Sequence, residues 1–245
     1  MKYFFLILCL NEEELLEKTF DELLEITKKT NLNNYKVYIC NDGSSDDTLE
    51  IALKIKKKYP FVSVINNKKN IGPSLCVKNF LQKIDEDGKF IVLGGDNDIN
   101  KNLLYRLVKS SELADFVISY YLNREKKGYL RSILSSAFNL IYCSLFQVYA
   151  FYLQGPFVWP IKEVKNLNIY SKGIAYVGEV NTKLLRSGLS YLEVGGNMNT
   201  GSYASTSVKL INFIDIFFTL IHLIIEIYFK KKHQKFSRRV NSSIF

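Results

Sequence analysis

Short apolar runs alternate with longer amphipathic stretches along the first half of the chain. The apolar runs, each as long as one buried strand, cover residues 3–10, 35–40, 61–66, 89–94 and 115–121. Stretches with helical periodicity lie between them, at residues 12–30, 46–59, 71–84 and 100–112. Strands that alternate with such helices predict βαβ units. The first half is therefore expected to have an α/β fold, with a mixed, mostly parallel sheet flanked by helices.

The first apolar run also imitates a signal peptide, because it follows Lys2 and ends near Cys9. The run is short, a leucine rather than a small residue precedes the cysteine, and acidic residues follow at 12–14. We therefore expect a buried first strand and a chain that stays in the cytoplasm. The four cysteines are widely spaced without a CxxC pair, which is typical of small buried residues in a reducing compartment.

Residues 128–153 predict a helix that is apolar except for one stripe. The polar residues of the stripe are Ser132, Ser136, Asn139, Cys143 and Gln147. Their spacing of three or four residues places them on one side of the helix. We expect this helix to lie in a membrane interface with its apolar face in lipid. A transmembrane span and a buried core helix are the alternatives.

Residues 208–229 predict a second helix of the same kind. Its polar residues, again three or four apart, are Lys209, Asn212, Asp215, Thr219, His222 and Glu226. Six basic residues follow within 230–239. A basic segment beside a membrane helix contributes about 1 kcal/mol per charge on an anionic cytoplasmic surface. We expect peripheral or monotopic association with the cytoplasmic face of the cell membrane; a transmembrane anchor with its basic flank on that side is the alternative.

Composition narrows the class of protein. The 245 residues are 47 % hydrophobic and 23 % charged, which excludes a disordered chain, collagen and a disulfide scaffold. Two histidines exclude a histidine-rich metal site. The net charge of +9 would suggest nucleic acid, but outside residues 230–239 only 27 basic residues stand against 24 acidic ones. We therefore expect an anionic membrane surface, and no nucleic acid, as the partner of this charge.

Polar residues gather where three of the predicted strands end. The sequences there are L-N-E-E-E at 10–14, C-N-D-G-S-S-D-D-T at 40–48 and G-G-D-N-D-I-N at 94–100. The carboxyl ends of parallel strands meet at one edge of a sheet, where α/β proteins bind ligands. The chain has neither GxGxxG nor GxxxxGK[ST], which argues against a dinucleotide-binding dehydrogenase and a P-loop NTPase.

Asp96 and Asp98 flank one residue just after a buried strand. Alternate carboxylates at such a corner can converge on one divalent cation and leave positions open for phosphate oxygens. The alternative is a plain turn with a helix N-cap, which Asp and Asn also favour. Gly94 and Gly95 permit close approach of the backbone to a ligand.

Asp42 follows the second strand directly, and its ionised carboxylate can accept hydrogen bonds from a nucleobase or from ribose hydroxyls. Asp46 and Asp47 are expected to cap the helix that begins there. Gly72, in the sequence N-I-G, stands at the start of the next helix.

Taken together, N-E-E, N-D-G-S-S-D-D-T, N-x-G and D-N-D resemble the signatures of family 2 glycosyltransferases of GT-A fold, and within them the polyprenyl-phosphate branch of dolichyl-phosphate-mannose synthase type. This resemblance implies that Asp42 binds the base of a nucleotide sugar. It places Leu10, Asn11, Glu12 and Gly72 around the same substrate. It also implies that Asp96, Asp98 and Asn100 hold Mg²⁺ or Mn²⁺.

The resemblance is looser on the acceptor side. Arg131 and Ser135 match an R-x-x-x-S pattern of the branch, and residues 154–161 resemble its Gly-Pro loop. An expected Gly-Ser-Arg is replaced by residues 118–120, with Arg124 as the nearest substitute, and an expected R-x-x-G-x-S is replaced by residues 199–205. Glu179 is a candidate carboxylate for activating the acceptor; the alternative is a first-turn glutamate that interacts with its helix dipole.

These observations predict a metal-dependent inverting glycosyltransferase, with Asp98, Arg131 and Glu179 as catalytic residues and polyprenyl phosphate as acceptor. A transferase acting on a hydroxyl of a surface glycan or glycolipid is one alternative, and a non-catalytic nucleotide-binding membrane protein is another. We expect a catalytic domain over 1–205, divided into a nucleotide-sugar half (1–120) and an acceptor half (121–205), followed by a membrane helix and basic tail over 206–245.

Overall fold

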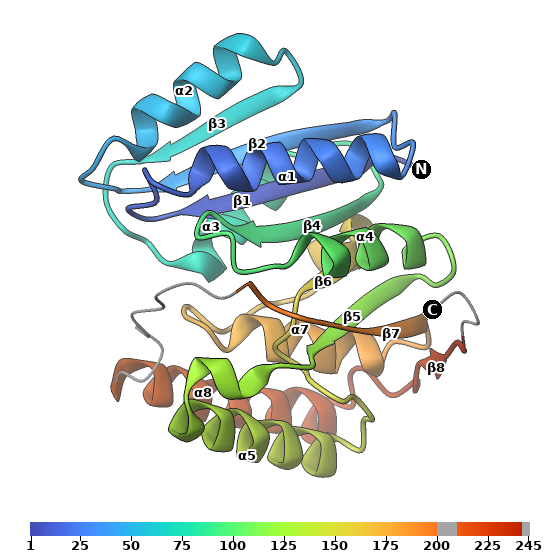
Figure 1. Cartoon of the computed structure of the whole chain (residues 1–245). Helices are drawn as coiled ribbons and strands as arrows, with labels where there is room; N and C mark the ends of the chain where they lie inside the picture. The colour runs from blue at the N-terminus through green and yellow to red at the C-terminus, as the bar shows by residue number, and fades with distance from the viewer. Residues whose placement is uncertain (200–209, 242–245) are drawn as a thin grey trace.

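The chain forms one eight-stranded sheet with helices on both faces, in the order β3-β2-β1-β4-β6-β5-β7-β8 (Figure 1). The computed structural model describes residues 1–199 and 210–241. The α/β fold with a mixed, mostly parallel sheet is therefore confirmed.

The first half contains four parallel strands, which are β1 (Tyr3–Cys9), β2 (Tyr35–Asp42), β3 (Val62–Asn67) and β4 (Lys89–Gly94). The helices between them are α1 (Leu16–Lys29), α2 (Thr48–Lys58), α3 (Pro73–Gln82) and α4 (Lys101–Ser110). All eight elements fall where the hydrophobic pattern predicts them. β1 is covered by helices on both faces, which explains its uninterrupted apolar sequence.

The second half adds one antiparallel strand and two parallel pairings. β6 (Phe157–Pro160) runs antiparallel between β4 and β5 (Phe116–Tyr121), and β7 (Ser190–Gly196) lies parallel to β5. The short β8 (Arg238–Arg239) joins the edge beside β7. The helices are η1 (Arg124–Lys127), α5 (Tyr129–Phe146), α6 (Ile161–Lys165), α7 (Tyr176–Leu185) and α8 (Leu210–Ile224), which continues as η2 (Ile225–Phe229).

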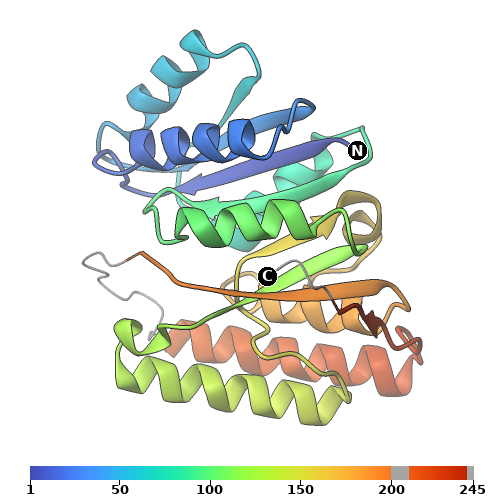
Figure 2. The same ribbon diagram turned by 45° about the vertical axis from the view of Figure 1, so that its right-hand side comes forward.

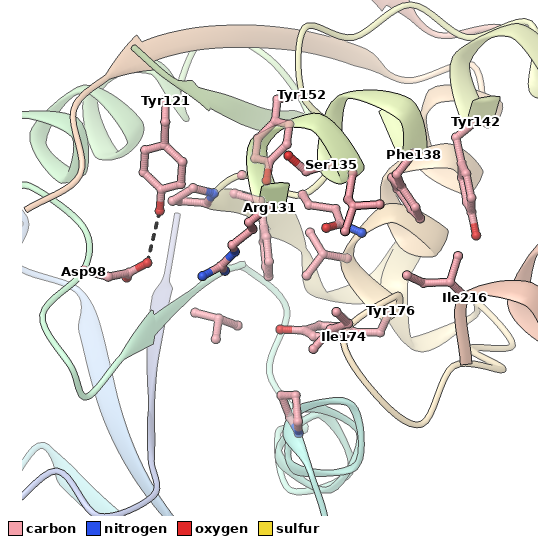
Figure 3. Close-up of a pocket in the computed structure, with 18 of the residues that line it drawn as sticks. Asp98, Tyr121, Arg131, Ser135, Phe138, Tyr142, Tyr152, Ile174, Tyr176 and Ile216 are labelled. Atoms are coloured by element: carbon pink, nitrogen blue, oxygen red, sulfur yellow. Dashed lines mark hydrogen bonds between the residues drawn. The ribbon is translucent and has the colours of Figure 1, made fainter. Parts of the chain in front are cut away.

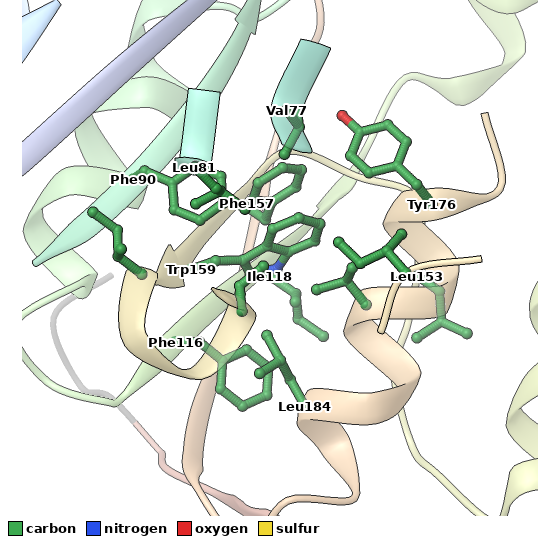
Figure 4. Packing of buried hydrophobic residues seen from close by; sticks show 14 of the residues in the cluster. Val77, Leu81, Phe90, Phe116, Ile118, Leu153, Phe157, Trp159, Tyr176 and Leu184 are labelled. Carbon is green, nitrogen blue, oxygen red and sulfur yellow. The ribbon is translucent and has the colours of Figure 1, made fainter. Parts of the chain in front are cut away.

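Two apolar cores hold these layers together, one on each face of the sheet. The core under α1, α2 and α4 is built on β1, β2 and β4. The other core packs α3, α5, α6, α7 and α8 against the opposite face, with Phe157 and Trp159 stacked at its centre (Figure 4). α5 and α8 lie side by side at the end of the molecule away from β3 (Figures 1 and 2).

Some residues of the polar stripes on α5 and α8 bond to the protein, whereas Ser136, Gln147 and His222 are exposed. On α5, Asn139 donates to the backbone oxygens of Ala150 and Phe151 and accepts from the backbone nitrogen of Leu153. On α8, Asp215 accepts from the backbone nitrogens of Lys172 and Ala175. The apolar residues of both helices are partly exposed, as at Leu140 and Phe217, and partly buried, as at Tyr142 and Leu223. The connecting segments need hydrogen-bond partners, and Asn139 and Asp215 supply them.

A buried row of charges joins α7 to the last helical segment. Lys183 Nζ lies 2.8 Å from a carboxylate oxygen of Glu179 and 2.8 Å from one of Glu226. All three side chains are almost fully buried. The segment that continues α8 is therefore fixed to α7 by this row.

The basic segment folds back along the domain beyond this row. Arg239 forms an ion pair with Glu193 at 3.2 Å and lies over the rings of Tyr149 and Phe151. The backbone of Arg238 and Val240 donates to residues 189 and 191. The side chains of Lys230, Lys231, Lys235 and Arg238 remain exposed.

Candidate active site

The turns after β1 and β2 are tied to each other by side-chain hydrogen bonds. Asn11 Oδ1 accepts from the backbone nitrogen of Ser45 at 2.8 Å, and the backbone nitrogen of Glu12 donates to Thr48 Oγ1 at 2.8 Å. Asp46 accepts from the backbone nitrogen of Thr48, so it starts α2 as expected; Asp47 makes no such side-chain bond. Leu10, the other residue predicted to line the nucleotide pocket here, is exposed.

Asp42 is buried at the end of β2 and organises the loop that leads into α3. Its carboxylate accepts from the backbone nitrogens of Ile71 and Gly72, both at 2.9 Å, and from Asn67 Nδ2 at 3.0 Å. The structure therefore brings Asp42 and Gly72 together. A carboxylate has about four lone-pair positions, so Asp42 keeps capacity for a further donor such as a ring N–H of a base.

Asp96 and Asp98 converge on the empty side of Gly94. A Cβ atom added at Gly94 would lie 2.3 Å from Asp96 Oδ1 and 3.5 Å from Asp98 Oδ1. Such a cradle of two carboxylate oxygens suits a hard divalent cation. Within residues 1–199 and 210–241 no group of three or more His, Cys, Asp or Glu side chains could hold a metal ion. Protein ligands alone would thus leave several coordination positions for phosphate oxygens and water.

Glu12 lies close to the same carboxylates. Burial, followed by the charges of Asp96, Asp46 and Asp98, raises the pKa of Glu12 to about 7. Several carboxylates thus lie close together at this edge of the sheet, and a bound cation would reduce their mutual repulsion.

The turn between the two aspartates is held by Asn199, which follows β7. Asn199 Nδ2 donates to the backbone oxygen of Asn97 at 2.9 Å. The backbone nitrogen of Asn199 donates to the backbone oxygen of Asp98, also at 2.9 Å. Asn100 Nδ2 in turn donates to Asn199 Oδ1, while Asn100 Oδ1 accepts from the backbone nitrogen of Asn102 and caps α4. Asn100, which the sequence predicts as a metal ligand, thus has its side-chain oxygen in the cap of α4.

Tyr121, at the end of β5, donates a hydrogen bond to Asp98 Oδ2 at 3.3 Å (Figure 3). It orients one carboxylate of the pair from the acceptor side. The apolar pattern of β5 showed only a strand residue here, so sequence reasoning missed this contact. Asn199 was missed for the same reason, since its partner loop is about a hundred residues away.

A cavity of about 510 Å³ extends from Asp98 toward α5 and α8. Arg131 and Ser135 line it near Asp98, as Figure 3 shows, and Tyr142 and Ile216 lie at the other end. Most of the lining is apolar, and half of the lining residues come from α5, α7 and α8. The arrangement joins an acidic site to a hydrocarbon-like channel that ends between the two helices with exposed apolar faces.

Arg124 is held against the start of α5 and not inside the cavity. Its Nη2 donates to Ser135 Oγ at 2.8 Å and to Ser136 Oγ at 3.1 Å, and its guanidinium lies over the ring of Tyr152. Among the predicted acceptor-side residues, Arg131 and Ser135 line the cavity, and Arg124 supports Ser135 from behind.

Glu179, which the sequence predicts as a catalytic residue, does not line the cavity. The side chain is fully buried, and its carboxylate accepts from the backbone nitrogens of Tyr170 and Ser171 and from Lys183. The alternative prediction places Glu179 in the first turn of a helix, and the structure has it in the first turn of α7. The segment that replaces the expected R-x-x-G-x-S lies, apart from Asn199, outside the described residues.

Comparison with known proteins matches the sequence model described as "Glycosyl transferase family 2" to residues 5–155. A dolichyl-phosphate beta-glucosyltransferase of Trichomonas vaginalis is 24% identical over 153 residues, which are 56% of this chain and 46% of that protein. A poly-beta-1,6-N-acetyl-D-glucosamine synthase of Staphylococcus aureus is 27% identical over 106 residues, 43% of this chain and 24% of that protein. The chain thus spans less than half the length of these curated relatives.

The fold is shared with a solved mannosyltransferase of Pyrobaculum calidifontis, in complex with GDP-Man and Mn²⁺. The TM-score is 0.62 at 12% identity, over 90% of this chain and 64% of that one. This likeness confirms the expected GT-A fold.

Proposed function

Since the chain belongs to glycosyl transferase family 2, we propose that it transfers a sugar from a nucleoside diphosphate sugar to a lipid phosphate at a membrane surface. The observation that carries this proposal is the cavity that joins Asp98 to the apolar space between α5 and α8. A polyprenyl phosphate has the matching form, because its phosphate is charged and its chain is entirely apolar.

The donor would bind at the edge where β1, β2 and β4 end. Asp42 offers its remaining acceptor capacity to the base, and the turns around Asn11 and Gly72 form the walls. Asp96 and Asp98 would hold Mg²⁺ or Mn²⁺, which when bound neutralises charge on the leaving diphosphate. Tyr121 and Asn199 keep the two carboxylates converged while the donor binds.

The reaction would be a direct displacement with inversion. An oxygen of the acceptor phosphate forms the new bond to the anomeric carbon, and the bond to the diphosphate oxygen breaks with its electron pair. A phosphate monoester, with a second pKa of about 6, is largely ionised at neutral pH. No general base is then needed, which agrees with the burial of Glu179 behind backbone donors.

Membrane association would place the acceptor at the mouth of the cavity. The exposed apolar surface of α5 and α8 is formed by residues including Leu130, Ile133, Leu140, Phe213, Phe217 and Phe229. One helix, Asn212–Phe229, is also long and apolar enough by composition to cross a membrane. Its inward-facing Asp215 and Glu226 favour a position in the interface plane, at the cytoplasmic face where the exposed lysines meet anionic lipid.

The test uses the full chain in detergent with radiolabelled UDP- and GDP-sugars and Mn²⁺. Polyprenyl phosphate, polyprenol and an oligosaccharide are offered as acceptors in parallel. The proposal expects labelled product with polyprenyl phosphate alone. Product with the oligosaccharide or the free alcohol would replace it with a hydroxyl-directed transferase, and nucleotide binding without turnover would replace it with a non-catalytic protein.

A further inference from the structure

We infer that Gln154 binds the phosphate group of the acceptor, as a neutral donor that works beside Arg131. The inference rests on the proposed function and adds a residue that selects the charged headgroup. It starts from a hydrogen-bond donor that the folded chain leaves unused inside the cavity.

The Nε2 atom of Gln154 is buried and has no hydrogen-bond partner among the described residues. Leaving a buried amide unpaired is costly, so natural proteins rarely do so without a reason. Gln154 lines the same cavity as Asp98, Arg131 and Ser135. A ligand oxygen in that cavity would supply the missing partner.

The backbone around Gln154 is fixed from both sides. The backbone nitrogen of Leu153 donates to Asn139 Oδ1, and its oxygen accepts from Asn181 Nδ2, both at 2.8 Å. On the other side Ser119 Oγ donates to the oxygen of Pro156 at 2.7 Å. A side chain presented from such a backbone is positioned before the ligand arrives, as a binding group requires.

Two other donors near Asp98, Ser135 and Tyr121, are already engaged. The hydroxyl of Ser135 donates to the oxygen of Ser132 and accepts from Arg124. Tyr121 donates to Asp98. Arg131 supplies positive charge, and the amide of Gln154 supplies a directed N–H, a combination that suits a phosphate oxygen.

A second unpartnered polar atom of the cavity is the hydroxyl of Tyr142. Tyr142 follows Arg131 by eleven residues, about 16 Å of helix, so it cannot act beside Arg131. Gln154 directly precedes β6, and β6 runs antiparallel beside β4, so its backbone lies toward the end of the sheet where β4 leads into Asp96 and Asp98.

Binding to short acceptor analogues tests the inference. The full chain is titrated calorimetrically with farnesyl phosphate, farnesol, UDP and GDP, as wild type and as Gln154→Ala, Gln154→Glu and Gln154→Asn. Gln82→Glu, an exposed glutamine on α3, is the matched control. We expect Gln154→Ala to weaken farnesyl phosphate binding roughly 10-fold and Gln154→Glu roughly 100-fold, because the new carboxylate repels the phosphate.

Binding of farnesol and of the nucleotides should change less than about threefold in all variants. Equal losses for farnesyl phosphate and farnesol, or no loss relative to Gln82→Glu, would overturn the role of Gln154 and leave the proposed acceptor standing. Weakened nucleotide binding in the soluble Gln154→Asn variant would reassign the residue to the donor. A wild-type chain that binds nucleotide but no farnesyl phosphate would overturn the proposed acceptor itself, and this inference with it.

Discussion

The ammonium group of Lys183 lies between two buried carboxylates, 2.8 Å from Glu179 and 2.8 Å from Glu226. The first belongs to the same helix, and the second comes from the segment that continues α8. This one side chain therefore fastens the apolar helix to the catalytic domain from the inside. Because α8 also lines the cavity, through residues such as Ile216 and Leu220, the same fastening holds one wall of the candidate active site.

Replacing Lys183 by methionine should destabilise the protein severely. The change leaves Glu179 and Glu226 buried without their shared cation, and breaking a buried pair in this way costs about 3–5 kcal/mol. The free energy of unfolding in detergent, from denaturant titration, measures the loss. Lys54→Met, which breaks an exposed pair with Glu50 on α2, should cost less than about 0.5 kcal/mol. Similar losses in both variants would contradict the importance of the buried row.

Acidification should loosen the same region in two steps. Burial lowers the pKa of His233 below 6.5, against the attraction of Glu226. Burial alone would raise the pKa of Glu226, but the hydrogen bond and charge of Lys183, helped by His233 and Lys232, hold it below 4.5. For both groups the unfolded chain binds protons more readily, so the free energy of unfolding falls as the pH decreases, first around 6.5 and then below 4.5.

Denaturant titrations across this pH range check the two steps. His233→Gln should lack the first step and Glu226→Gln the second. An unchanged profile in His233→Gln would show that the first step comes from another group.

Gly94→Ala should abolish metal-dependent donor binding without unfolding the chain. The added Cβ would lie 2.3 Å from Asp96 Oδ1, so that carboxylate must leave the cradle. We expect loss of Mn²⁺-dependent nucleotide binding and at least a roughly 100-fold loss of sugar transfer, comparable with Asp98→Asn. Circular dichroism serves as the folding control. Retained Mn²⁺-dependent binding would place the metal elsewhere.

Tyr121→Phe should weaken metal binding more mildly. The variant keeps the ring but removes the hydroxyl that donates to Asp98. Loss of a group that orients a metal ligand costs roughly 10-fold or more in metal affinity. The Mn²⁺ concentration that half-saturates nucleotide binding should rise accordingly, and an unchanged value would reduce Tyr121 to a packing residue.

Acidic substitutions on the exposed apolar surface should detach the protein from membranes. Phe217→Asp on α8 and Leu140→Asp on α5, alone and combined, are expected to lower sedimentation with anionic liposomes, because a carboxylate in the interface opposes insertion. Leu53→Asp on α2, an exposed leucine on another part of the molecule, is the matched control. Equal sedimentation of all variants would show that this surface is not the one that meets lipid.

The first half of the chain was predictable because its information is local. Each strand of that half is an apolar run, and each functional turn follows its strand directly, so the order of residues is enough to place Asp42, Asp96 and Asp98 at one edge of the sheet. The second half of the chain depends on contacts between distant segments. Tyr121 and Asn199 contact the turn at 97–98 from other elements, and no local pattern marks these contacts.

Periodicity also shows that a stripe exists without showing what it faces. Of the polar residues on α8 and its continuation, Asp215 and Glu226 bind the protein, whereas His222 is exposed. The surroundings of Glu179 also depend on a distant residue, because Lys183 beside it contacts Glu226. Whether a polar residue on a helix faces the protein can be told only when its contact partner elsewhere in the chain is known.

The attachment of α8 to the rest of the fold through Lys183 affects which acceptor atoms can come close to Asp98. If the α5–α8 surface rests in the bilayer, the packed fold holds Asp98 at a fixed height above the lipid. A reactive oxygen is then selected by its depth as well as by its chemistry. A phosphate at the headgroup level meets that distance, whereas the tip of a long glycan would extend past it.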